Sequence, residues 1–91
     1  MKRKIVGIPD GDTVKTKVKV QGSNYLRPVG FNTPEKGQRG FNLAKERFKK
    51  ALPKNGVVNI KVIGRDIYGR SLVELKNGRK SINKIMKAYG Y

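Results

Sequence analysis

The stretch DTVKTKVKV, residues 12–20, decides the fold of this chain. Its even positions from Val14 to Val20 carry apolar or β-branched side chains, while the odd positions from Lys15 to Lys19 are all lysine. Successive side chains of a strand point to opposite faces, so this period of two predicts a half-buried strand with a lysine stripe outside.

Short strands and tight turns lie on both sides of this stretch. Residues 3–8 are typical of a strand, and the Asp-Gly pair at residues 10–11 is typical of a hairpin turn. Residues 21–24, Gln-Gly-Ser-Asn, predict the next turn, and residues 25–31 predict a third strand. The first third of the chain is therefore expected to form three consecutive strands.

The pattern then changes to a helical period. Phe41, Ala44, Phe48 and Leu52 recur at helical spacing, which predicts a helix over residues 38–52. A proline directly after Leu52, and a glycine soon after it, end this helix.

Two further strands and a second helix follow. Residues 57–63 and 70–76 are typical of strands, and an Asn-Gly turn follows the second. Ser81 is expected to cap a short helix whose apolar stripe runs from Ile82 to Tyr89. The order is three strands, a helix, two strands and a helix. It predicts one mainly β, α+β domain over residues 1–91, a five-stranded Greek-key barrel of the OB-fold kind with two helices.

The composition narrows the chemistry that this domain can perform. The chain has no cysteine and no histidine, which excludes disulfides, thiolate nucleophiles and histidine bases. A general base must then be a carboxylate. A metal ion must bind oxygen ligands, which favours calcium or magnesium.

The charge points to a polyanionic partner. Lys and Arg number 22 against 6 Asp and Glu, a net charge of +16, so we expect DNA or RNA as the partner. An acidic membrane surface is the weaker alternative, but no apolar run approaches the length of a membrane helix and we expect no membrane partner. We expect a monomer. The apolar part of MKRKIVGIP is too short for a signal peptide. A mature secreted fragment would look the same, so both a secreted and a cytoplasmic location stay open.

Four carboxylates lie at the ends of predicted strands, in PDGDTV, NTPEKG and RDIYGR. Asp10 precedes a glycine and is interpreted as a turn former, and Asp66 is interpreted as the partner of a neighbouring arginine. Asp12 begins a strand, where aspartate is depleted, and Glu35 follows a proline without an evident turn role. Asp12 and Glu35 are therefore the carboxylates for which we expect a function.

Three short motifs occur in a fixed order: DGDTV, an arginine eight residues before the glutamate of NTPE, and DIYGR. They resemble the motifs of the staphylococcal nuclease (thermonuclease-like) family. SLVEL and NGRKSINKIMKAYG follow the rhythm of the same family, so the resemblance covers nearly the whole chain. It implies a five-stranded OB-fold barrel and, in active members, calcium-dependent cutting of DNA and RNA.

The resemblance also implies a role for each motif residue. Calcium would be held by Asp12, Asn32 and the carbonyl oxygen of Thr33, Glu35 would be the general base, and Arg27 and Arg70 would grip the scissile phosphate. Tyr68 either contacts a nucleotide phosphate or ring, or is partly buried at a strand start. A base, two guanidiniums and a cation suit hydrolysis, because the charge of a phosphodiester must be neutralised before water attacks.

The chain departs from the family in several places. Asn32 stands where the family usually has aspartate, and the missing charge predicts a weakly bound calcium ion or none. Pro28 follows Arg27 in a predicted strand, so we expect a bulge or an edge that re-aims Arg27. Ile67 stands where the staphylococcal enzyme has a lysine. The family's tyrosine-bearing loop and third helix have no counterpart in residues 1–91. We therefore expect either a minimal member or a trimmed domain, with a looser substrate site and lower stability.

Three functions stay open at this point. The first is a calcium-dependent nuclease weakened by Asn32. The second is a non-catalytic OB-fold module that binds nucleic acid, and the third is a small basic RNA-binding protein of ribosomal type. Carboxylates beside arginines favour the first two, since a protein that only binds phosphate gains nothing from them. The presence of Glu35, Arg27 and Arg70 together favours the nuclease.

Overall fold

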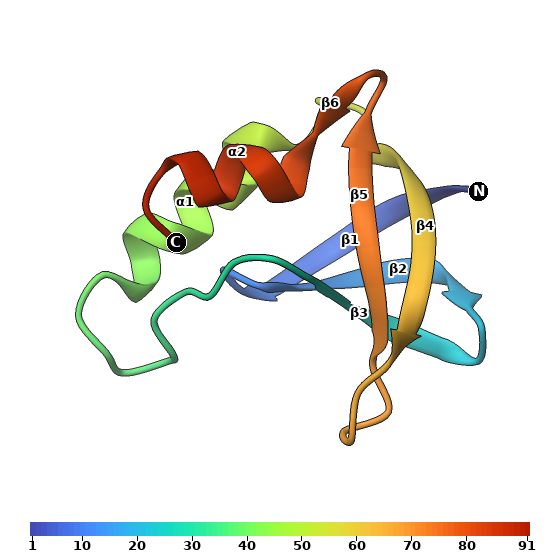
Figure 1. Cartoon of the computed structure of the whole chain (residues 1–91), viewed down its shortest axis with the longest axis horizontal. Coiled ribbons are helices and arrows are strands. Elements are labelled where there is room, and N and C mark those ends of the chain that lie inside the picture. Colours follow the sequence, from blue (N-terminus) through green and yellow to red (C-terminus); the bar gives the residue numbers. More distant parts are fainter.

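The computed structural model describes residues 1–91 (Figure 1). Its elements are β1 (Lys2–Asp10), β2 (Thr13–Val20), β3 (Ser23–Pro28), α1 (Phe41–Ala51), β4 (Val57–Arg65), β5 (Ser71–Asn77), β6 (Lys80–Ser81) and α2 (Ile82–Ala88). The predicted order of strands and helices is confirmed, and only the two-residue β6 was not indicated by the sequence. Neither helix is long and apolar enough to cross a membrane.

Five strands close into a barrel. Antiparallel pairing gives the order β3-β2-β1-β4-β5, and a parallel pairing of β3 with β5 closes the ring, with Leu26 opposite Ser71 and Pro28 opposite Val73. Figure 1 shows the two helices lying together at one side of the crossing strands. This is the OB-fold-like α+β architecture that the sequence predicts.

A core of 12 buried apolar residues fills the barrel. Helix α1 presents Ala44 and Phe48 to this core, both fully buried at the predicted helical spacing. The Phe48 ring packs edge-on against Phe31, with ring centroids 5.9 Å apart. Because Phe31 lies in the loop after β3, the core anchors the segment that carries NTPE.

Two element boundaries differ from the predictions by three residues, and the others differ by two residues or fewer. Strand β3 ends at Pro28 instead of residue 31, because proline has no N–H to continue the ladder. Helix α1 begins at Phe41 instead of residue 38, since Gly40 adopts a left-handed conformation with φ of 87° directly before it. The cap of α2 is as predicted, with the Ser81 hydroxyl accepting the Lys84 N–H at 3.2 Å.

Two apolar side chains expected in the core lie outside it. Val18 is 55% exposed, because the register of β2 against β3 shifts in this part of the strand and the Thr16 hydroxyl donates to the Val18 carbonyl oxygen at 2.8 Å. Tyr89 is 46% exposed, since it lies beyond the end of α2. Its ring packs instead against the guanidinium of Arg47, 4.6 Å from the ring centroid.

The loop after β3 is tied to the helical side of the molecule. The Asn83 amide on α2 donates to the Val29 carbonyl oxygen at 2.7 Å and also exchanges hydrogen bonds with the backbone of β5. Further along the loop, the Asn32 N–H donates to the Tyr91 carbonyl oxygen at 3.0 Å. These bonds fix both ends of the turn from which the NTPE segment continues.

Candidate active site

A polar cleft lies where the β1–β2 turn, β3, the loop after β3 and the residue preceding β5 meet. Its volume is about 690 Å³, and no hydrophobic residue lines it. The lining residues are Asp10, Asp12, Arg27, Asn32, Thr33, Glu35, Lys36, Gln38 and Arg70. Three carboxylates face three cationic side chains, so the cleft is balanced in charge although the whole chain is strongly basic.

Every predicted site residue except Tyr68 lines this one cleft. The residues are far apart in sequence, and the closure of the barrel brings them together. Tyr68 lies outside the cleft, 78% exposed, with its ring centroid 5.6 Å from the guanidinium of Arg70. The partial burial considered for Tyr68 is therefore wrong, and its ring stands open beside an arginine of the cleft.

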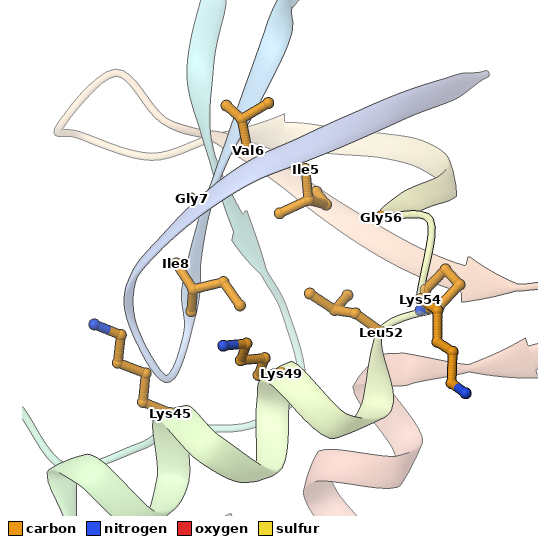
Figure 2. A pocket seen from close by; sticks show the side chains of 10 residues that line it. Ile5, Val6, Gly7, Ile8, Lys45, Lys49, Leu52, Lys54 and Gly56 are labelled. Carbon is orange, nitrogen blue, oxygen red and sulfur yellow. The ribbon is translucent and has the colours of Figure 1, made fainter.

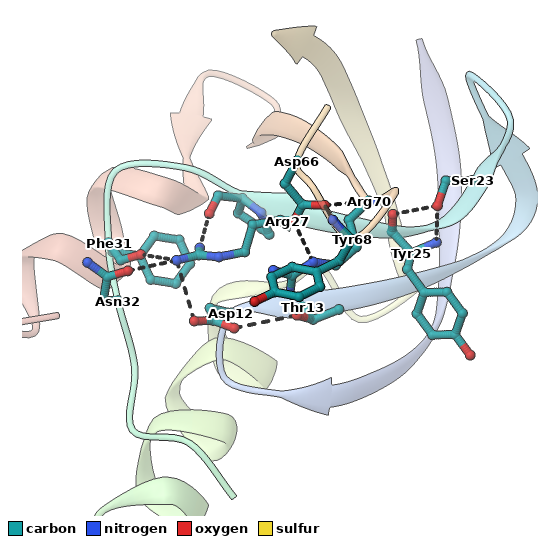
Figure 3. A network of polar contacts seen from close by, with 11 residues as sticks. Asp12, Thr13, Ser23, Tyr25, Arg27, Phe31, Asn32, Asp66, Tyr68 and Arg70 are labelled. Atoms are coloured by element: carbon teal, nitrogen blue, oxygen red, sulfur yellow. Dashed lines mark hydrogen bonds and ion pairs between the residues drawn. The ribbon is translucent and has the colours of Figure 1, made fainter. Parts of the chain in front are cut away.

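The Arg27 guanidinium turns into the loop after β3. Its Nη2 donates to the Phe31 carbonyl oxygen and to Asn32 Oδ1, both at 2.9 Å, and lies 3.4 Å from Asp12 Oδ2 (Figure 3). Its Nη1 donates to the carbonyl oxygen of Pro28. Arg27 therefore bridges the two side chains on which a calcium site would depend.

Asp12 occupies a position that disfavours its charge. Burial raises the pKa of Asp12, and the hydrogen bond and negative charge of Asp10 raise it further, against the lowering effects of Arg27 and of the Thr33 backbone. Asp10 also forms the expected turn, since its Oδ1 accepts the Asp12 N–H at 3.1 Å. A cation beside this carboxylate pair would favour the ionised form.

Arg70 is held from two sides. Its Nε donates to Asp66 Oδ2 at 2.7 Å and its Nη1 donates to the Thr13 hydroxyl oxygen at 2.8 Å, whereas its Nη2 has no hydrogen-bond partner (Figure 3). Asp66 Oδ1 in turn accepts the backbone N–H groups of Tyr68 and Arg70 at 3.0 and 2.9 Å. The predicted pairing of Asp66 with an arginine is confirmed. It leaves one guanidinium nitrogen of Arg70 able to donate to a bound anion.

The Asp66–Arg70 pair predicts how stability depends on pH. Partial burial raises the pKa of Asp66, but hydrogen bonds from the Arg70 backbone and side chain, with the Arg70 charge, outweigh it and lower the pKa overall. A carboxyl with a lowered folded-state pKa stabilises the fold above its unfolded pKa of about 3.9, and this stability is lost as the pH falls toward the folded-state value.

We therefore expect Asp66→Asn to lower the free energy of unfolding by about 1–3 kcal/mol at pH 7. The difference from the unsubstituted protein should shrink steadily below about pH 4, because protons then bind the carboxyl of the unfolded chain more readily than the folded-state carboxyl, whose pKa is lowered. Urea unfolding of both proteins at pH 7 and at pH 3 measures it. An equal difference at both pH values would show that the carboxylate charge does not matter.

Glu35 combines a fixed backbone with a free carboxylate. The Gln38 side chain accepts the Glu35 N–H at 2.7 Å, and the Gln38 N–H donates to the Glu35 carbonyl oxygen at 2.9 Å. The Glu35 side chain is exposed to the cleft and takes part in no ion pair.

The supporting contacts of Gln38 and Thr13 were not predicted from the sequence. No motif marks Gln38, whereas Thr13 could have been noticed because it follows Asp12 within DGDTV.

The donor atoms of the cleft suit a weakly held calcium ion. Asp12, Asn32 and Thr33 offer oxygen ligands, the type that calcium takes, and the Thr33 hydroxyl is buried without a hydrogen-bond partner. Gly11 permits this arrangement, since a Cβ there would lie 2.9 Å from that hydroxyl oxygen.

The same cleft limits how tightly calcium can bind. No three acidic side chains lie close enough together to hold a metal ion by themselves, and Asn32 Oδ1 already accepts a hydrogen bond from Arg27. The residues present therefore fit calcium, with an affinity below that of a site built from a full set of carboxylates.

A second hollow, of about 490 Å³, lies between β1 and α1 (Figure 2). Apolar side chains, among them Ile5, Ile8 and Leu52, form its floor, and lysines including Lys45 and Lys49 stand at its edge. No carboxylate lines it. This hollow therefore lacks a general base and an anionic metal ligand, and the candidate chemistry belongs to the polar cleft.

Comparison with known proteins does not assign the chain to a family. No protein-family model matches it, and no curated protein matches it. The likeness to the staphylococcal nuclease family accordingly stays a hypothesis that rests on the motif residues. The geometry adds that these residues, apart from Tyr68, line a single cleft.

Proposed function

We propose that this protein is a metal-dependent phosphodiesterase that cuts DNA or RNA, a weakened nuclease of the thermonuclease-like kind. The cleft carries this proposal. One polar surface of this chain, whose net charge is +16, carries three kinds of group. They are a free carboxylate, a guanidinium oriented by an ion pair, and oxygen ligands for a cation. Each of these groups has a use in hydrolysis of a phosphodiester, whereas phosphate binding alone requires only the cationic ones.

The residues of the cleft divide the work as follows. Glu35 takes the proton of the attacking water, because its carboxylate has no competing partner and the chain has no histidine. Arg70 donates from Nη2 to a phosphoryl oxygen as negative charge develops there. Arg27 supplies positive charge beside Asp12 and can donate to the phosphate when its bond to Asn32 is exchanged.

A calcium ion held by Asp12, Asn32 and Thr33 would polarise the phosphoryl group when bound. Asn32 brings an oxygen but no charge, so we expect activity only at millimolar calcium. The nucleic acid itself is held mainly through its backbone by lysines and arginines. Cutting should therefore show little sequence preference and decline with rising salt.

A non-catalytic nucleic-acid-binding module is the second candidate. The hydrogen bond from Arg27 to Asn32 Oδ1 favours it, because an arginine in this position already supplies the positive charge that a metal ion would bring. In such a module, the cleft would bind one phosphate of the backbone without cutting it.

Digestion of single-stranded DNA in millimolar calcium, with a chelator in a parallel reaction, tests the proposal. Shortening of the DNA that requires calcium would support the nuclease. Intact DNA at every calcium concentration, with binding that weakens steeply from low to moderate salt, would instead identify the binding module.

A further inference from the structure

The outer face of β2 and β3 carries an aromatic ring that neither the core nor the cleft uses. Tyr25 on β3 is 44% exposed, and the Nζ of Lys15, its cross-strand partner on β2, lies 5.7 Å from the ring centroid. The Ser23 hydroxyl accepts the Tyr25 N–H at 3.1 Å and donates to the Tyr25 carbonyl oxygen at 2.9 Å. The backbone of Tyr25 is thus fixed while its ring stays accessible.

This ring lies next to the cleft. Leu26 is fully buried, so Tyr25 and Arg27 on either side of it lie on the outer face of β3, about 7 Å apart along the strand. In Figure 3 Tyr25 lies on the far side of Tyr68 and Arg70 from Asn32, and the Tyr68 ring stands against Arg70. A nucleic acid strand with a phosphate at Arg27 that runs along the outer face of β3 would therefore reach the Tyr25 ring.

We infer that Tyr25 is a stacking platform for an unpaired base of single-stranded nucleic acid, with Lys15 beside it to contact a neighbouring phosphate. The inference rests on the proposed function, because it names the form of nucleic acid that the cleft receives. Every base has a flat π-face, so stacking on an exposed ring tolerates any sequence. In a duplex these faces are covered by neighbouring bases, and the platform can then contribute nothing.

Binding of a labelled single-stranded oligothymidylate and of a duplex, both in chelator, tests the platform separately from cutting. The proteins compared are the unsubstituted chain, Tyr25→Ala, Tyr25→Phe and Tyr89→Ala. Tyr89 is the matched control, since its ring is similarly exposed at 46% and also packs on a cation, but it lies on the helical side. Thermal unfolding of each variant checks that the barrel is intact.

We expect Tyr25→Ala to weaken binding of the single strand about 5- to 150-fold, the equivalent of ~1–3 kcal/mol for one stacked base. Tyr25→Phe keeps the π-face and should bind as the unsubstituted protein does, as should Tyr89→Ala. Duplex binding should be the same for all four proteins. Equal single-strand binding by Tyr25→Ala and the unsubstituted protein would overturn the inference, and so would an equal loss on single strand and duplex.

Failure of the platform and failure of the proposed nuclease give different results. If Tyr25→Ala binds normally, the platform is absent, and calcium-dependent cutting by the unsubstituted protein can still be observed. If the unsubstituted protein never cuts, the nuclease is wrong, and selective loss of single-strand binding in Tyr25→Ala still establishes the platform.

Discussion

Glu35→Gln is expected to slow hydrolysis of single-stranded DNA about 10²–10⁴-fold, while binding of the DNA changes little. Glutamine has nearly the shape of glutamate but cannot accept a proton from water. The Glu35 side chain forms no ion pair, and its backbone is held by Gln38, so the substitution should leave the loop in place. Initial cutting rates in millimolar calcium, with DNA binding measured in chelator, give both quantities.

Glu46→Gln is the matched control for this substitution. Glu46 lies on the exposed face of α1, outside the cleft, and its replacement changes the net charge by the same amount. Equal cutting rates for Glu35→Gln and the unsubstituted protein would remove Glu35 from the mechanism. Equal slowing by both substitutions would point to overall charge, not to a general base.

Arg70→Lys is expected to lower the cutting rate about 10²–10³-fold, the usual cost of losing one donor aimed at a developing negative charge. A lysine keeps the charge but has no planar guanidinium. In Arg70, Nε and Nη1 donate to Asp66 and to the Thr13 hydroxyl, and Nη2 is left for the phosphate. The single amine nitrogen of a lysine cannot make all three contacts. Rates at saturating DNA separate this loss from weaker binding.

Arg79→Lys serves as the comparison for Arg70→Lys, since Arg79 is exposed in the turn between β5 and β6 and lies outside the cleft. Thermal unfolding should accompany the rates, because Arg70→Lys also loosens the pair with Asp66. Unchanged cutting by Arg70→Lys would mean that the guanidinium does not contact the transition state. A similar loss in Arg79→Lys would attribute the effect to general phosphate binding.

Much of the fold is predictable from the sequence because its determinants are local. The alternation along residues 12–20 and the helical spacing of Ala44 and Phe48 each report which face of an element meets the core. Val18 shows the limit of that reasoning. Its exposure depends on a register shift between two strands, and a single strand's pattern contains no information about its partner's register.

For the candidate site, too, one part is predictable from the sequence and another part is not. The motif residues, apart from Tyr68, line the cleft, because they lie in turns, loops or strand ends that the closed barrel brings together. The orientation of Arg27 could not be predicted, since it depends on carbonyl oxygens that the path of the loop after β3 brings near it. The contact of Arg70 with Thr13 joins residues 57 positions apart, and only the closed barrel brings them together.

Asn32 is the residue on which the two candidate functions differ. In a nuclease it is a metal ligand that lacks a charge, and in a binding module it is a partner that holds Arg27 in place. Asn32→Asp adds a negative charge without adding bulk. The substitution therefore asks directly whether the cleft is a hydrolytic site with an impaired metal ligand.

The most direct measurement is the rate of single-stranded DNA cutting across a calcium titration, for the unsubstituted protein, Asn32→Asp and the double variant Asn32→Asp/Glu35→Gln. We predict that Asn32→Asp reaches half its maximal rate at about tenfold lower calcium or less, because a second carboxylate then attracts the ion. The double variant should lose this activity, which excludes a contaminating nuclease. No cutting by Asn32→Asp at any calcium concentration, or the same rate in all three proteins, would contradict the account.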